Sequence, residues 1–158
     1  MPVLTPDIRS RIEAVLPNYP SKQAATLPAL HLVHDHFREV STEAIVEIAE
    51  ILELHPSQVH DTMSFYEFFR EPGNPLGRDR VWVCRSISCA LRGGEELLAE
   101  LCDHWQTRPG ETTADGRVSL EFAECLGVCE GAPCVLVNDE CHPNMTTEAV
   151  TKLIAQRQ

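Results

Sequence analysis

Seven cysteines, all after residue 83, are the side chains with the clearest chemical potential in this 158-residue sequence. Four of them form two spaced pairs: Cys84 and Cys89 are separated as C-x4-C, and Cys125 and Cys129 as C-x3-C. Cysteine thiolates bind transition metals and act as nucleophiles. Four thiolates that meet at one point complete a metal or iron–sulfur centre, so the pairs are candidate ligands if the chain brings them together.

Each pair lies at the end of a segment with the pattern of a β-strand. Cys84 closes the β-prone run RVWVC, and Cys125 follows the run RVSLEFAE. In the second run, apolar residues alternate with polar ones as in a half-buried strand: Val118, Leu120 and Phe122. If these two strands are neighbours, their carboxyl ends place both cysteine loops at one edge of the sheet.

Three interpretations of the four cysteines remain after comparison: a [2Fe-2S] cluster, a structural zinc site and ordinary buried cysteines that bind nothing. Structural zinc sites usually draw on C-x2-C turns, and the sequence has no C-x2-C, which also excludes a thioredoxin-type dithiol. A plant-type ferredoxin needs a third nearby cysteine, which CRSISCALRGG lacks. Two widely spaced, separated pairs therefore favour a [2Fe-2S] cluster with two thiolates on each iron. Zinc and ordinary buried cysteines remain as alternatives.

The residues around the second pair bear on which thiols bind. Gly127 and Gly131 allow backbone N–H groups to approach cluster sulfurs closely. Cys134 forms a second C-x4-C with Cys129, so spacing alone leaves open a ligand set that includes it. Because Cys134 follows Pro133 and begins the apolar run CVLV, we expect it at the start of a core strand.

The other candidate ligands have simpler interpretations. We expect Cys102, within LLAELCDHW, to be a core residue and Cys141 to be an edge or surface thiol. His31 and His34 share a helix face near His36, but helical histidines beside polar residues are expected to be solvated rather than metal-bound.

Helical patterns cover residues 1–72. Ser41 is placed as the N-cap of the segment STEAIVEIAEILEL. Its buried face follows the helical spacing of Ile45, Ile48, Ala49 and Leu52. This part of the chain is therefore expected to be a small helical bundle.

Two earlier helices and one later helix complete the bundle. We expect the earlier ones at residues 6–17 and 21–37, with Pro28 kinking or dividing the second. Ser57 is expected to cap the later helix, which leads into SFYEFF. The aromatic residues of SFYEFF are predicted to form its core contact.

The composition changes at residues 70–80, REPGNPLGRDR, which are rich in proline and glycine and so indicate a linker. After it the predicted order is β-α-β-β-(β)-α, a small α/β sandwich that ends with the helix TTEAVTKLIAQ. The sequence thus predicts an α+β chain with a helical bundle at 1–72, a linker at 73–80 and an α/β domain at 81–158.

The composition narrows the range of partners. A net charge of -11 argues against nucleic acid and anionic membranes, which attract clustered Lys and Arg. No apolar stretch is long enough to span a bilayer, and the start lacks the pattern of a secretory or transit leader. We expect a reducing, cytoplasmic location, where thiols favour metal binding over disulfides.

The elements VCRSISCALRGGEELL and ECLGVCEGAPCVLVND, with 35 residues between Cys89 and Cys125, resemble the thioredoxin-like [2Fe-2S] ferredoxin family. More narrowly, they resemble the family of the 24-kDa subunit of NADH:quinone oxidoreductase, respiratory complex I. The likeness extends upstream through LPALHLVHDHF, AIVEIAEILEL and SFYEFF, and so covers nearly the whole chain. At Cys134 the sequence departs from the family, which has a large apolar residue there.

The resemblance implies a thioredoxin-like domain whose cluster ligands are Cys84, Cys89, Cys125 and Cys129. It also implies electron exchange with the FMN of a flavoprotein NADH-binding partner of the 51-kDa type in a larger redox complex. FMN and NADH belong to that partner, and LRGGEE lacks a dinucleotide-binding fingerprint, so no substrate site is expected here. Peripheral placement on the cytoplasmic side of the inner membrane, through the complex alone, would follow.

After this resemblance, the sequence still leaves open the identity of the complex and the kind of metal site. The same module serves NAD-dependent formate dehydrogenases and hydrogenases, and a structural zinc module for protein interaction remains a further alternative. Part of the SFYEFF face is a candidate docking surface for the flavoprotein.

Charged residues near the pairs bear on the reduction potential. Arg85 and Arg92 flank the first pair and would raise it, whereas Glu121, Glu124 and Glu130 would lower it. We expect a low-potential centre with a midpoint below zero.

Overall fold

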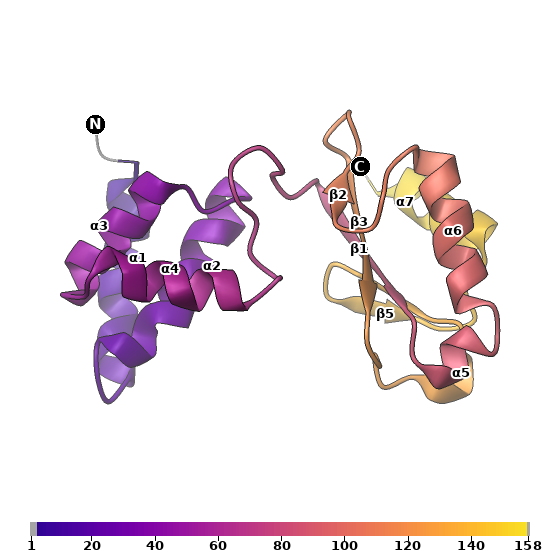
Figure 1. Cartoon of the computed structure of the whole chain (residues 1–158), viewed down its shortest axis with the longest axis horizontal. Helices are drawn as coiled ribbons and strands as arrows, with labels where there is room; N and C mark the ends of the chain where they lie inside the picture. Colours follow the sequence, from indigo (N-terminus) through magenta and orange to yellow (C-terminus); the bar gives the residue numbers. More distant parts are fainter. Residues whose placement is uncertain (1–2, 158) are drawn as a thin grey trace. The chain divides into compact units, whose positions relative to one another are not determined.

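The computed structural model describes residues 3–157 and divides into two compact units, one ending at Pro75 and the other beginning at Leu76. Figure 1 shows helices alone in the first unit and a sheet with helices in the second. Among the described residues, no helix combines the length and apolar character that crossing a bilayer requires.

Four α-helices form the first unit, as the sequence predicted. They are α1 (Pro6–Val15), α2 (Thr26–Phe37), α3 (Thr42–Leu52) and α4 (Pro56–Phe65), with 3-10 turns η1 (Leu16–Asn18) and η2 (Gln23–Ala25) before α2. The predicted helix at 21–37 is divided ahead of Thr26, which leaves Pro28 in the first turn of α2. A first-turn proline removes no intrahelical hydrogen bond, so α2 needs no kink there.

Local capping explains where α3 and α4 begin. The Ser41 hydroxyl accepts from the Ala44 N–H at 3.1 Å, which confirms the predicted cap of α3. The predicted Ser57 cap of α4 is wrong, because His55 is the N-cap and its Nδ1 accepts from the Ser57 N–H at 3.2 Å. Pro56 occupies the first helical position, where its fixed φ favours the start of a helix.

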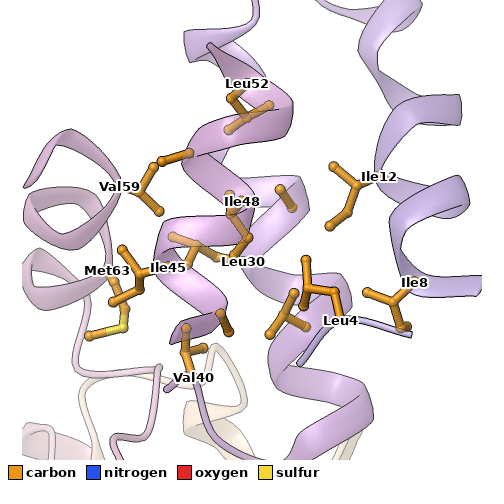
Figure 2. Packing of buried hydrophobic residues seen from close by; sticks show 14 of the residues in the cluster. Leu4, Ile8, Ile12, Leu30, Val40, Ile45, Ile48, Leu52, Val59 and Met63 are labelled. Atoms are coloured by element: carbon orange, nitrogen blue, oxygen red, sulfur yellow. The ribbon is translucent and has the colours of Figure 1, made fainter. Parts of the chain in front are cut away.

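The core of the first unit is formed by apolar side chains from all four helices, shown in Figure 2. Its largest fully buried members include Ile8, Ile12, Leu30, Ile48 and Leu52. Full burial of each such side chain stabilises the fold by about 1.5–3 kcal/mol.

Two predictions for the first unit are corrected by its core. His34 is fully buried, not solvated, and its ring lies 5.3 Å from Phe68 and 5.6 Å from Phe69 between ring centroids. SFYEFF splits at the end of α4: Phe69 is buried, whereas Phe65 is 79% and Tyr66 41% exposed. The core prediction therefore holds for Phe69 and is wrong for Phe65 and Tyr66.

The second unit contains a five-stranded sheet in the order β2-β3-β1-β4-β5. Its strands are β1 (Asp79–Cys84), β2 (Glu111–Thr112), β3 (Val118–Ala123), β4 (Val135–Val137) and β5 (Glu140–His142). Its helical segments are α5 (Ile87–Ala90), α6 (Gly94–Trp105), η3 (Cys129–Gly131) and α7 (Thr147–Gln156). Strand β1 begins within the stretch predicted as linker, and β2 within the predicted loop PGETTADG.

The central strands β1 and β3 are parallel, and their inner side chains form the second core with α6 and α7. Val81 and Leu120 are paired in register, and both are fully buried. Phe122, predicted to share that buried face, is instead 37% exposed and stacks 3.8 Å from the Arg85 guanidinium carbon. Ser119 and Glu121 are buried as well, so β3 is covered on both faces up to Glu121 and the predicted half-buried alternation is wrong.

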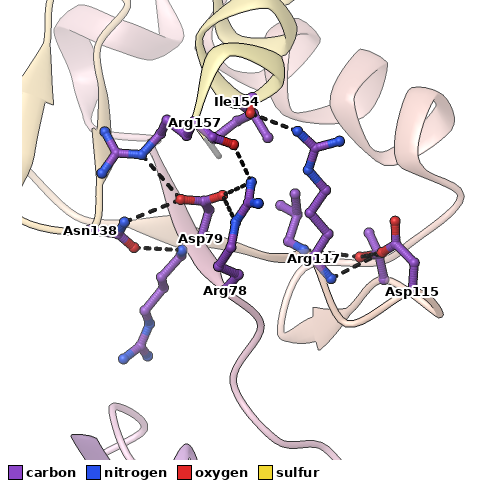
Figure 3. Close-up of polar contacts among 10 residues, drawn as sticks. Arg78, Asp79, Asp115, Arg117, Asn138, Ile154 and Arg157 are labelled. Atoms are coloured by element: carbon purple, nitrogen blue, oxygen red, sulfur yellow. Dashed lines mark hydrogen bonds and ion pairs between the residues drawn. The ribbon is translucent and has the colours of Figure 1, made fainter.

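A polar network holds the opposite end of β1 against the end of the chain (Figure 3). The buried Asp79 carboxylate accepts from Arg78 Nη2 at 2.8 Å, Arg157 Nε at 3.1 Å and Asn138 Nδ2 at 3.3 Å. Arg117 donates to the Ile154 carbonyl at 2.9 Å. These bonds fix the start of β1, and with it the position of Cys84 at the other end.

Candidate metal centre

Both cysteine loops leave the same edge of the sheet. Strand β1 ends at Cys84, β3 ends at Ala123, and these two residues are partners in the parallel register. The Arg85 N–H donates to the Ala123 carbonyl at 2.9 Å, so the pairing continues into the loops. The two strands are thus neighbours, the condition on which the meeting of the cysteine pairs depended, and the loops start side by side.

The first loop folds tightly around its two cysteines. Cys89 lies in α5, and its N–H donates to the Ser86 carbonyl at 2.8 Å. A side chain on Gly94 would meet the carbonyl oxygens of Cys84 and Cys89 at 2.9 Å. Only glycine at this position allows α6 to start directly against the loop.

The second pair is close and exposed. The Sγ atoms of Cys125 and Cys129 lie 3.6 Å apart. A tetrahedral metal ion with metal–sulfur bonds of about 2.3 Å holds its sulfur ligands about 3.8 Å apart. The Cys125–Cys129 pair is therefore spaced to share one metal ion.

Gly127 contributes to the second pair as predicted, but Gly131 does not. Gly127 has a φ of +81°, and its N–H donates to Cys125 Sγ at 3.4 Å. Gly131 instead packs against Pro143, whose Cβ would clash with a side chain added at this glycine. Gly127 therefore donates a hydrogen bond to a sulfur, whereas Gly131 allows the loop to pack closely.

Three buried thiols form a second group, and one of them is Cys134. The sulfurs of Cys84, Cys89 and Cys134 all lie within 4.8 Å of one another, and those of Cys89 and Cys134 are 3.7 Å apart. In residues 3–157, no other group of at least three Cys, His, Asp or Glu side chains brings its ligand atoms this close. The start-of-strand prediction for Cys134 is confirmed, because β4 follows it, but its sulfur faces the predicted ligands.

Apolar contacts join the two loops. Cys84, Cys89, Ala132 and Cys134 form one buried cluster, against which Leu126 and Val128 of the second loop pack. The Cys129 thiol also interacts electrostatically with Cys89 and accepts a hydrogen bond from Ser88. The four predicted ligands thus occupy one region, with a fifth thiol beside them.

The thiol pKa values divide according to their surroundings. Burial alone would raise the pKa of Cys84, but the backbone N–H groups of Leu126 and Ser86 and the neighbouring thiols outweigh it and hold that pKa below its usual value. Burial raises the pKa of Cys89, and burial followed by the hydrogen bond to Cys89 raises that of Cys134. The hydrogen bond and charge of Cys125 raise the pKa of Cys129. Metal binding requires the thiolate, so this environment favours Cys84 as a candidate ligand.

The acidic surroundings are less negative than the sequence suggested. Arg85 Nη2 lies 2.6 Å from a Glu124 oxygen, and Arg80 forms a buried bidentate pair with Glu121 at 2.9 and 2.8 Å. Two of the three carboxylates expected to lower a cluster potential are therefore paired with arginines. Among these three carboxylates, Glu130 is left as the main support for a low potential.

The donor set fits a [2Fe-2S] cluster. It offers one exposed thiol pair, a buried thiol group and backbone N–H groups directed at Cys84 and Cys125 sulfurs. Such amides stabilise the anionic sulfurs of a cluster. Cys141 is exposed on β5, as predicted, whereas Cys102, predicted as a core residue, is only half-buried and packs against the second core.

The spacing of Cys134 was the one available signal for its place in this site. It follows Cys129 as a second C-x4-C, yet the apolar run after it argued for a core position. The side chain of a residue that immediately precedes a strand is not constrained by the alternation within it. Sequence reasoning therefore could not decide which way this sulfur points.

Comparisons with known proteins agree with this site. The family model for thioredoxin-like [2Fe-2S] ferredoxins matches residues 12–158. An NADH-quinone oxidoreductase subunit of Rhizobium meliloti is 35% identical over 93% of this chain and 86% of its own length. An NADH-quinone oxidoreductase subunit of Pseudomonas aeruginosa is 35% identical over 96% of this chain and 90% of its own.

Among solved structures, an NAD+-reducing [NiFe]-hydrogenase in the H2-reduced state superposes with a TM-score of 0.68 at 26% identity, over 80% of this chain and 21% of that one. The family match spans both the helical unit and the cysteine loops. On these grounds, the chain belongs to the thioredoxin-like [2Fe-2S] ferredoxin family.

Proposed function

We propose that this chain is an electron-transfer subunit of an NADH:quinone oxidoreductase, with a [2Fe-2S] cluster held by Cys84, Cys89, Cys125 and Cys129. The observation that carries the proposal is the meeting of two thiol pairs at the carboxyl ends of the parallel strands β1 and β3. The choice of this complex is supported by relatives that are named as NADH-quinone oxidoreductase subunits and are similar over nearly the whole chain.

The residues of the site have distinct roles in this proposal. The four thiolates bind the two irons, and the N–H groups of Gly127 and Leu126 stabilise ligand sulfurs. Leu126 and Val128 limit the access of water to the buried thiols. When bound, the cluster supplies a one-electron redox centre.

The partner in this proposal is a flavoprotein of the 51-kDa type, which holds FMN and binds NADH. This chain exchanges electrons with that flavin and has no substrate site of its own. It reaches the cytoplasmic face of the inner membrane through the complex alone. The exposed Phe65 and Tyr66 are candidate contacts for the flavoprotein.

Iron and acid-labile sulfide analysis of the purified chain tests the proposal. About two irons and two sulfides per chain, with a visible charge-transfer spectrum, are expected. The Cys125→Ala variant should lose most of both, because an exposed iron would keep a single thiolate. One zinc per chain in a colourless protein would instead establish the structural zinc module.

A second candidate is the same module in an NAD-linked hydrogenase or formate dehydrogenase. The likeness to the NAD+-reducing [NiFe]-hydrogenase favours it, although this chain spans about a fifth of that one. Mass spectrometry of proteins that copurify with the native chain separates the two. Quinone-reductase components support the first candidate, and a nickel-containing or formate-oxidising component supports the second.

A further inference from the structure

The buried side of the site contains one thiol more than a [2Fe-2S] cluster needs. If Cys125 and Cys129 hold one iron, the other iron requires two thiolates, and three are available: Cys84, Cys89 and Cys134. All three are at most 2% exposed. The inference concerns which two of these thiols bind iron, and it therefore rests on the proposed function, in which the chain holds the cluster.

The third thiol is already spaced as a ligand. The Cys89 and Cys134 sulfurs are 3.7 Å apart, against the separation of about 3.8 Å at a tetrahedral metal ion. The exposed pair has nearly the same spacing, 3.6 Å. Cys89 and Cys134 could therefore hold one iron together without a large movement.

The backbone fixes Cys134 in this position. The Cys84 N–H donates to the Cys134 carbonyl at 3.2 Å, and the Cys134 N–H is directed at the Cys89 sulfur. Strand β4 then continues the antiparallel pairing with β1 through Val135 and Val83. Removal of the Cys84 side chain leaves these backbone bonds in place, so the Cys89–Cys134 pair should persist.

We propose that Cys134 is a reserve ligand that takes the place of Cys84 at the buried iron. In the intact chain, Cys84 and Cys89 bind this iron, and Cys134 remains a thiol beside them. When Cys84 is missing, the Cys134 thiol releases its proton to solvent and its sulfur binds the iron. The cluster then keeps four thiolates and an unchanged total charge.

Four variants of the full chain test this proposal by iron and sulfide content, visible spectrum and the EPR spectrum of the reduced protein. Cys134→Ala should keep the wild-type spectrum, because the resting ligands are intact. Cys84→Ala should keep about two irons per chain with shifted absorption bands and g values, because one ligand has changed. The double variant Cys84→Ala/Cys134→Ala should lose the cluster.

The matched control is Cys84→Ala/Cys102→Ala, which removes the same number of thiols but takes the second from α6, within the other core. It should keep the cluster as Cys84→Ala does, and circular dichroism should show that all variants are folded. Cluster loss in folded Cys84→Ala, or in Cys134→Ala alone, would overturn the proposal. A wild-type chain without iron would instead refute the proposed function.

Discussion

At the scale of single residues, backbone amides near the proposed ligand sulfurs would influence how readily a bound cluster accepts an electron. Gly127 donates its N–H to Cys125 Sγ at 3.4 Å from a φ of +81°, which alanine disfavours. Gly127→Ala should lengthen this bond and shift the reduction midpoint about 20–60 mV more negative. The measurement is an EPR-monitored redox titration, in which we expect the wild-type midpoint to lie below zero.

Gly116→Ala is the control for backbone strain. Gly116 has a φ of +69° and open space around it, but it lies in the turn between β2 and β3. Its variant should carry similar strain and leave the midpoint unchanged. Equal shifts in the two variants would show that the amide of Gly127 has no special effect.

The residue scale is also where prediction from sequence succeeded and failed most clearly. Spacing and strand pattern were enough to predict that each cysteine pair follows a strand, but not that the two strands are neighbours in the sheet. They could not reveal the packing of Gly131 against Pro143, because that contact joins residues whose proximity depends on the folded loop. The direction of the Cys134 sulfur could not be predicted for the same reason, because it depends on how the folded chain brings Cys134 next to Cys89.

At the scale of elements, the start of α6 determines the shape of the first cysteine loop. An alanine Cβ at Gly94 would lie 2.9 Å from the carbonyl oxygens of Cys84 and Cys89, and backbone atoms cannot rotate away. Gly94→Ala should therefore lower the free energy of unfolding by about 1–3 kcal/mol, as overpacking does. It should also reduce iron retention, because the loop must move.

Glu95→Ala provides the comparison for Gly94→Ala, since Glu95 is exposed in the same first turn. Its effect on stability should stay within about 0.5 kcal/mol. Chemical unfolding monitored by circular dichroism measures both variants. A Gly94→Ala protein as stable as wild type would mean that the loop accommodates the extra methyl group.

Elements with strong periodicity were predicted well, and of the short strands β4 and β5 were predicted, whereas β2 was not. The cap at Ser41 and the buried stripe of α3 followed from local pattern. The two-residue strand β2 pairs with β3 and has no periodicity of its own to detect. His34 was misjudged because its burial comes from Phe68 and Phe69, which lie far along the sequence.

At the scale of the whole molecule, each of the two units has a hydrophobic core of its own among the described residues. One is formed by the four helices and the other by the sheet with α6 and α7. All five cysteines of the candidate site, together with the Asp79 network, belong to the unit that begins at Leu76. Domains of this size can fold alone when they have a core of their own.

We therefore predict that residues 76–158, expressed without the helical unit, fold and assemble the same cluster. Each ligand keeps its neighbours in this fragment, so the iron content, the visible spectrum and the EPR g values should match those of the full chain. The fragment with Cys125→Ala serves as its control and should be colourless. Failure of a folded fragment to hold iron would show that the helical unit contributes to cluster assembly, whereas an unfolded fragment would show that the second core depends on the first.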